Sequence, residues 1–287
     1  MQNKRTLTIL VIIIVIFSGI SSLTGILTKQ GPGVYEYETI RGKTVEIYGK
    51  GVYQHMTADV AIQGIAQDYV TFFLAIPFLL FALWWYRKGS LKGHFLLAGT
   101  LGYFFVTYLF YTIMGMYNYL FLLYLVLLCC SFFGLFISMV SINLSNLPTS
   151  FSVKAPVRFA GGFLIFNSIA IALLWLEMII PPLLDGTIYP DALNHFTTLI
   201  VQGLDLGLLL PVCFVSGWLL IKKESLGYLS GTVYLVFLSF LMTALVAKII
   251  AMAINGVNVI PVIFIIPAIN LITITCAVLM IKNIIRD

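Results

Sequence analysis

Eight apolar runs, each about as long as a bilayer is thick, recur along this chain and constrain its fold more than any other feature. A helix needs about 20 apolar residues to cross the hydrocarbon core, and only helices and closed barrels satisfy their backbone hydrogen bonds there. Charged residues make up 9% of the chain, against roughly 25% in soluble domains. The sequence therefore predicts an all-α integral membrane protein with spans at about 6–27, 64–86, 95–115, 120–143, 159–182, 196–221, 229–254 and 259–281.

The first run is long and is not followed by a clear small-x-small cleavage site, so we interpret it as a retained helix rather than a signal peptide. The next stretch, 28–62, is the one long loop of the chain. Within it, Val34 to Ile40 and Thr44 to Tyr48 are rich in β-branched and aromatic residues, with a glycine-containing break between them. This pattern predicts a small extracytoplasmic β-hairpin between the first two spans.

The distribution of basic residues predicts how the spans are oriented. Eleven of the sixteen Lys and Arg residues fall at one end of the predicted bundle: Lys4, Arg5, Arg87, Lys88, Lys92, Lys154, Arg158, Lys222, Lys223, Lys282 and Arg286. Because basic loops stay cytoplasmic, we expect a multi-pass protein of a cell membrane with both termini in the cytoplasm. The net charge of +5 does not indicate nucleic-acid binding, since these residues are distributed between membrane spans.

Two stretches, Gln63 to Leu91 and Gln202 to Leu226, resemble each other. Each opens on Gln-Gly with an Asp close behind, has Pro and Trp seven residues apart, and ends with two basic residues shortly before Ser-Leu. The Gly99-Thr100 pair in the following span is echoed by Gly231-Thr232. The resemblance predicts a 4+4 parallel internal repeat, related by an axis along the membrane normal. Its halves would be 1–143 and 159–287, joined by a cytoplasmic linker at 144–158.

Four charged residues lie within the predicted spans, namely Asp68, Glu177, Asp205 and Lys248. Counted from the basic end at about 1.5 Å per helical residue, all four stand roughly 25–30 Å away, near the far edge of the hydrocarbon core. Such residues are the first place to look for function. Other polar residues gather at the same level, and with them we predict an outward-facing polar cavity beneath the hairpin: Gln63, Gln67, Tyr103, Tyr111, His195 and Gln202.

The leading functional hypothesis is that this cavity binds a small polar or charged solute for proton- or cation-coupled secondary transport. Asp205 and Asp68 would carry the coupled charge, the three glutamines would orient the solute, and Lys248 would be a counter-ion or an anion contact. Structural alternatives remain open for several of these residues. Lys248 and Asp205 could form an ion pair that only locks two helices together, Glu177 could be a boundary residue, and the tyrosines could be packing residues.

Two other classes of function remain open. The chain could be a membrane-embedded enzyme acting on a lipid-like substrate at the outer leaflet, with His195, Asp205 and His55 as acid, base or metal ligands. It could also be a non-catalytic partner or sensor subunit whose hairpin binds another membrane protein, or it could form a homo-oligomer. No metal or cofactor is expected, because nothing in the spacing of His55 and His195 requires a metal. A retinal-like Schiff base on Lys248 is a further alternative.

Several signatures are absent from the sequence. It contains no P-loop, no Gly-rich dinucleotide turn, no GxSxG and no HExxH, which excludes ATP-driven transport by this chain alone. The four cysteines, Cys129, Cys130, Cys213 and Cys276, all lie inside apolar runs without metal-binding spacing. We therefore expect them to be small packing residues.

Overall fold

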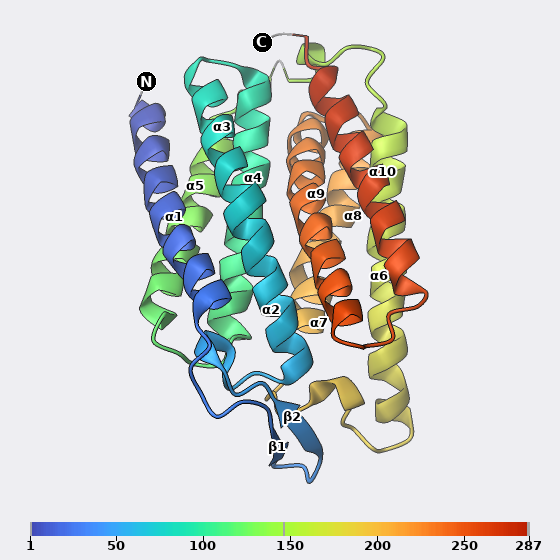
Figure 1. The fold of residues 1–287 in the computed structure, drawn as a ribbon. Helices are drawn as coiled ribbons and strands as arrows, with labels where there is room; N and C mark the ends of the chain where they lie inside the picture. The colour runs from blue at the N-terminus through green and yellow to red at the C-terminus, as the bar shows by residue number, and fades with distance from the viewer. Residues whose placement is uncertain (1, 146, 286–287) are drawn as a thin grey trace.

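The computed structural model describes residues 2–145 and 147–285, so Arg286, counted above with the basic end, lies outside them. Eight helical spans in the described residues are long and apolar enough to cross a membrane. The prediction of an all-α membrane protein is therefore confirmed. The spans stand side by side in one bundle, with both ends of the chain at the same end of it (Figure 1).

Six of the spans are single helices and two are composite. The single helices are α1 (Gln2–Leu27), α4 (Leu91–Ile113), α5 (Phe121–Val140), α6 (Val157–Leu184), α9 (Ser225–Ile254) and α10 (Val262–Lys282). The composite spans are α2 (Ala58–Val70) with α3 (Ile76–Arg87), and α7 (Ile200–Leu204) with α8 (Leu210–Ile221). In each composite span a five-residue π-helical turn joins the two helices, at Thr71–Ala75 and at Asp205–Leu209.

Each π-helical turn directly precedes a proline. In the first, the Ile76 N–H bonds to the carbonyl of Thr71, five residues back, and Pro77 follows. The second turn has the same construction before Pro211. A proline inside a helix lacks a backbone N–H and its ring crowds the carbonyl four residues back, whereas a π-helical turn loosens the hydrogen-bond ladder locally. The structure thus has a widened turn directly before each of these prolines.

The two composite spans also end in the same way. Both turn a tight corner through a residue with positive φ, and in both a glycine of the next helix presses on the backbone of the preceding one. Both stack a lysine on a tryptophan just before the corner. The residues of the first corner are Gly89, Gly93 and the pair Trp84 and Lys88, and those of the second are Lys223, Gly227 and the pair Trp218 and Lys222, in the same order. These are local likenesses, and the duplication of the whole chain stays a prediction.

Helices α4 and α9 lie against each other in the middle of the bundle. The first four spans, which include α4, stand together on one side of the bundle, and the last four, which include α9, stand on the other (Figure 1). Gly99 of α4 is placed where a Cβ would overlap Val236 of α9, so the glycine allows the two backbones to approach closely. Small residues drive helix association in membranes in this way, since apolar burial alone distinguishes little between lipid and protein.

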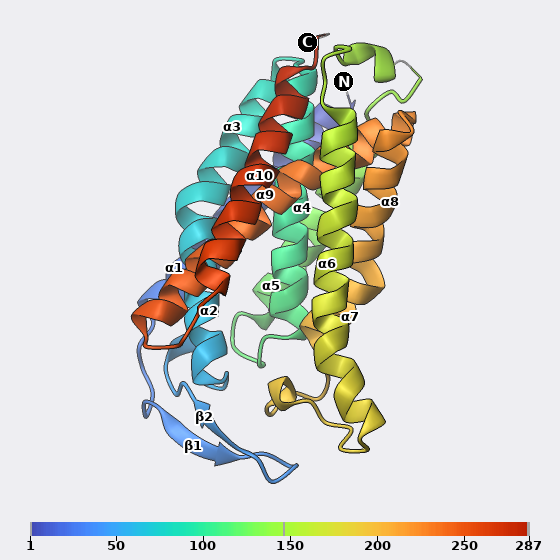
Figure 2. The same cartoon turned by 90° about the vertical axis from the view of Figure 1, so that its right-hand side faces the viewer.

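The predicted hairpin is confirmed, with shorter strands than expected. Strands β1 (Tyr35–Glu38) and β2 (Thr44–Ile47) are antiparallel, with Tyr35 opposite Ile47. A two-stranded sheet alone is marginally stable, and here Val45 and Ile47 are buried while Ile47 forms a bridge to Thr57. The hairpin projects from the end of the bundle away from the termini (Figures 1 and 2).

At the end that carries the termini, the linker pairs with the C-terminal segment. Phe151 and Ile284 form an antiparallel bridge. The Ser152 N–H donates to the carbonyl of Asn283 at 2.7 Å, and the Ile285 N–H donates to the carbonyl of Ser150 at 2.8 Å. The segment that joins the two sets of four spans is therefore held by the last described residues of the chain.

Candidate functional site

Asp68 is the most buried carboxyl group in the described part of the chain, with an exposed fraction of 1%. Its Oδ2 accepts a hydrogen bond from the Tyr53 hydroxyl at 2.7 Å and its Oδ1 accepts one from the Tyr111 hydroxyl at 3.0 Å. The two phenol oxygens are 3.1 Å apart. Tyr111 comes from α4, whereas Tyr53 belongs to the loop before α2, in a 3-10 turn at Gly51–Tyr53.

Two glycines make room for this arrangement. A Cβ on Gly25 of α1 would overlap the Asp68 carboxylate, and a Cβ on Gly64 of α2 would lie 2.6 Å from the Tyr53 ring. Burial, followed by the neighbouring Asp68, raises the pKa of the Tyr53 phenol well above its usual value, so the phenol stays protonated and acts as a donor. The loop therefore places a neutral hydrogen-bond donor on a carboxyl group inside the bundle.

A second polar cluster lies one residue earlier in the chain. The Gln67 amide nitrogen donates to the Tyr103 hydroxyl at 2.8 Å and to the Thr107 hydroxyl at 3.1 Å. The Thr71 hydroxyl lies 2.8 Å from that of Tyr103. The Gln67 carbonyl oxygen is buried with no partner among the described residues. In this conformation, polar side chains of the first four spans thus bond to one another at the depth where the sequence predicts a polar cavity.

In the second half of the chain, Asp205 is the carboxyl at this level, and it is partly exposed. It stands at the start of the second π-helical turn, and its Oδ2 accepts a hydrogen bond from the indole N–H of Trp175 in α6 at 2.8 Å. Lys248 of α9 interacts electrostatically with both Asp205 and Asp68. Within the described residues, its ammonium group is not within 4 Å of either carboxylate. The three charges therefore form a loose set rather than a closed ion pair.

The remaining predicted residues are placed differently. Gln63 and Gln202 are partly exposed, and neither makes a side-chain hydrogen bond to another described residue. Glu177 is exposed on α6, two residues beyond the tryptophan that bonds Asp205. The sequence did not indicate that Tyr53 and Trp175 donate hydrogen bonds to the two aspartates. Tyr53 lies in a loop, and Trp175 resembles any other apolar residue of a span. The sequence also did not indicate the hydrogen bond between Asn270 and Thr243, 3.2 Å long, which joins α10 to α9.

His195 is bound to the loop that carries His55, through the backbone. Its Nε2 lies 3.0 Å from the His55 carbonyl oxygen, and its ring packs edge-on against Tyr37 of the hairpin. Burial, together with the charge of Arg41, lowers the pKa of His195, while the bond to His55 opposes the shift. Across 2–145 and 147–285, no three His, Cys, Asp or Glu side chains gather closely enough to hold a metal ion.

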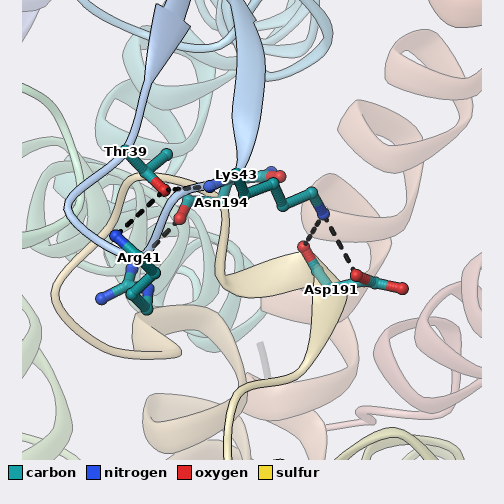
Figure 3. Close-up of polar contacts among 5 residues, drawn as sticks. All are labelled: Thr39, Arg41, Lys43, Asp191 and Asn194. Carbon is teal, nitrogen blue, oxygen red and sulfur yellow. Dashed lines mark hydrogen bonds and ion pairs between the residues drawn. The ribbon is translucent and has the colours of Figure 1, made fainter.

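Hydrogen bonds and an ion pair attach the hairpin to the loop that precedes α7, as Figure 3 shows. Lys43 forms an ion pair with Asp191 at 3.3 Å and also donates to the Asp191 carbonyl at 2.8 Å. One Arg41 nitrogen donates to the carbonyls of Asn194, at 3.1 Å, and Phe196, at 2.5 Å. These contacts connect the first half of the chain to the second over the end of the bundle at which the buried aspartate lies.

Comparison of the chain with protein-family models, with curated proteins and with solved structures finds no match.

Proposed function

We propose that this protein is a secondary transporter that binds a small polar or charged solute near the hairpin end of its bundle and couples its movement to a proton or cation. The observation that carries the proposal is the set of Asp68, Asp205 and Lys248, in which one lysine of α9 interacts with acids from both halves of the chain. Charges in spans are costly and usually mark ion or substrate pathways.

The charge balance of this set supports coupling. Two carboxyl groups interact electrostatically with one ammonium group, so with all three ionised one negative charge lacks a partner. A buried, unpaired carboxylate is strongly unfavourable. We therefore expect a proton or a cation to bind near these three residues. Its binding or release would change which of the two acids interacts more strongly with Lys248.

The helix geometry supports movement at the same place. Each acid lies beside or within a π-helical turn, Asp68 shortly before Thr71–Ala75 and Asp205 at the start of its own turn. π-Helical turns recur at functional sites, and interrupted spans surround the binding sites of many transporters. A shift of one such turn along its helix would move its acid relative to Lys248 without breaking the rest of the span.

The enzyme alternative has less support, because His195 is used to bind the His55 carbonyl. The partner-subunit alternative is also weaker, since the hairpin makes its polar contacts to its own chain. From the basic residues at the end that carries the termini, we further propose that this end is cytoplasmic and that the hairpin is outside. A homo-oligomer remains compatible with this arrangement.

The test uses proteoliposomes that contain a pH-sensitive dye, challenged with a panel of amino acids, organic acids, sugars and quaternary amines. A substrate of a proton-coupled transporter changes the internal pH, and we expect D205N and D68N to abolish that change while remaining folded. D185N, which makes the same carboxyl-to-amide change in an exposed loop, should behave as the wild type. Should well-folded D205N keep full coupled uptake, the proposed mechanism is wrong. Replacing the proton gradient with sodium or potassium gradients covers the cation-coupled case.

A further inference from the structure

Two adjoining pockets open at the end of the bundle that carries the termini, far from the charged set described above. The larger has a volume of about 560 Å³ and lies between the start of α1, the corner between α3 and α4, and the end of α5. The smaller, of about 320 Å³, lies between α1 and the end of α3, and Lys4 lines both. The corner and the start of α1 stand at the top of Figure 1.

Among the described residues, the charged side chains that line these pockets are all basic. They are Lys4, Arg5 and Arg87. The Lys4 ammonium donates to the Arg87 carbonyl at 3.2 Å, and the Arg87 guanidinium donates to the Thr8 hydroxyl at 2.9 Å. Within the described residues neither of these two side chains has a carboxylate partner. The two cations are thus positioned by neutral acceptors, and their charge remains available to an anion.

His94 supplies an acceptor in the wall of the larger pocket. The residue is only 8% exposed, and its ring packs against that of Tyr86 with centroids 4.6 Å apart. Its Nε2 lies 2.9 Å from the carbonyl oxygen of Ser138. A carbonyl can only accept, so Nε2 carries the proton and Nδ1 is left as an acceptor. Nδ1 has no hydrogen-bond partner among the described residues, so a hydroxyl donor is the group that suits it.

The corresponding corner of the second half is built differently. Glu224 stands at the place of Ser90 before the helix, and Tyr228 stands at the place of His94. The Tyr228 ring packs on Phe151 of the linker, with centroids 4.8 Å apart. That corner is therefore occupied by the chain itself and carries an acid, which leaves the first corner as the one suited to an external anion.

We propose that the two adjoining pockets together bind the glycerophosphate headgroup of an anionic phospholipid, of the phosphatidylglycerol type. The phosphate lies between Lys4 and Arg87, and a headgroup hydroxyl donates to Nδ1 of His94. Ile9, which lines the smaller pocket, is 51% exposed on α1 and leads the acyl chains onto the outer surface of the bundle. Basic pockets between spans are general sites for anionic headgroups. The proposal is independent of the transport function.

The experiment measures lipid binding to the full-length protein in detergent by native mass spectrometry, with phosphatidylglycerol and zwitterionic phosphatidylethanolamine as probes. The double variant K4Q/R87Q removes the two cations, and K222Q/K223Q removes two cations from the second corner as a matched control. We expect K4Q/R87Q to bind phosphatidylglycerol roughly 30-fold more weakly, from about 1 kcal/mol per basic residue and 1.4 kcal/mol per tenfold. The control should bind like the wild type.

Three outcomes overturn the proposal. Equal losses in the two double variants would mean that only the overall charge matters. Equal binding of the two lipids by the wild type would mean that the pocket does not recognise the anionic headgroup. Free glycerol 3-phosphate binding as tightly as the lipid would identify a soluble phosphate ester as the ligand instead. H94F, which keeps an aromatic ring on Tyr86, should bind phosphatidylglycerol more weakly than the wild type and phosphatidic acid, which has no glycerol headgroup, as tightly as the wild type.

Discussion

At the scale of single residues, the hydrogen bond between Tyr53 and Asp68 attaches the loop between α1 and α2 to a buried carboxyl group. A buried carboxyl group needs partners for its oxygens, and here the Tyr53 phenol provides one of them at 2.7 Å. The loop is thereby held on the bundle by the group that the proposed transport cycle would use. In the proposed transport cycle, withdrawal of Tyr53 would expose Asp68 and would require this hydrogen bond to break.

We expect Y53F to lower the free energy of unfolding by roughly 1–3 kcal/mol, because it leaves one oxygen of a buried carboxyl group without its donor. The measurement is thermal unfolding of the purified protein in detergent, followed by tryptophan fluorescence. Y48F is the matched control, since Tyr48 lies in the same loop and its hydroxyl makes no hydrogen bond to another described residue. If Y53F and Y48F unfold at the same temperature, the bond contributes nothing to stability.

At the scale of helices, the corner after each composite span depends on a glycine. A Cβ on Gly93 would lie 2.5 Å from the Tyr86 backbone nitrogen, and one on Gly227 would overlap the backbone of Leu219 and Leu220. Because these neighbours are backbone atoms, they cannot move aside as a flexible side chain would. The corners therefore require glycine for packing, independently of its conformational freedom.

Substitution by alanine tests this requirement. We expect G93A and G227A each to destabilise the protein by roughly 1–3 kcal/mol through overpacking. G162A in α6 is the control, because a Cβ there would meet no atom within 4 Å and alanine favours a helix by about 1 kcal/mol. The order of unfolding temperatures should be G162A at or above the wild type and the two corner variants below it. A corner variant as stable as G162A would contradict the packing argument.

At the scale of the whole molecule, two sets of polar contacts at opposite ends of the bundle join the halves of the chain, in addition to the packing of α4 on α9. One is the pairing of the linker with the C-terminal segment, and the other is the attachment of the hairpin to the loop before α7. The hairpin attachment includes a titratable group, His195, whose pKa is lowered in the folded protein by burial and by Arg41. Asp59 acts in the opposite direction, as does the bond to the His55 carbonyl.

The attachment should weaken in acid. Because the folded form binds a proton on His195 less readily than the detached loop does, the stabilisation is complete above the ordinary pKa of about 6.5 and is lost as the pH falls below it. Hydrogen exchange of the segment 185–199 at pH 7.5 and pH 5.5 measures this, with faster exchange expected at the lower pH after correction for the intrinsic rate. In H195Q the corrected difference should disappear. Should it persist there, another group is responsible.

The number of spans, their approximate positions and the hairpin after the first span could all be predicted from the amino-acid sequence. The physical reason is that bilayer thickness and backbone hydrogen bonding leave little choice once a run of about 20 apolar residues is present. The sequence also singled out Asp68, Asp205 and Lys248, since charges are conspicuous in such runs. The span ends were less well predicted, because α2 and α9 continue through polar residues at their starts.

Which of these polar residues contact one another could not be predicted from the sequence. Several spans are apolar on nearly every side, so their sequences do not indicate which face turns inward. In a membrane, partners are chosen by close packing and hydrogen bonds rather than by apolar burial. Tyr53 bonds Asp68 because its loop folds back into the bundle, and Trp175 bonds Asp205 because α6 packs on the second composite span. Lys248 interacts electrostatically with both acids because α9 packs against helices from both halves of the chain.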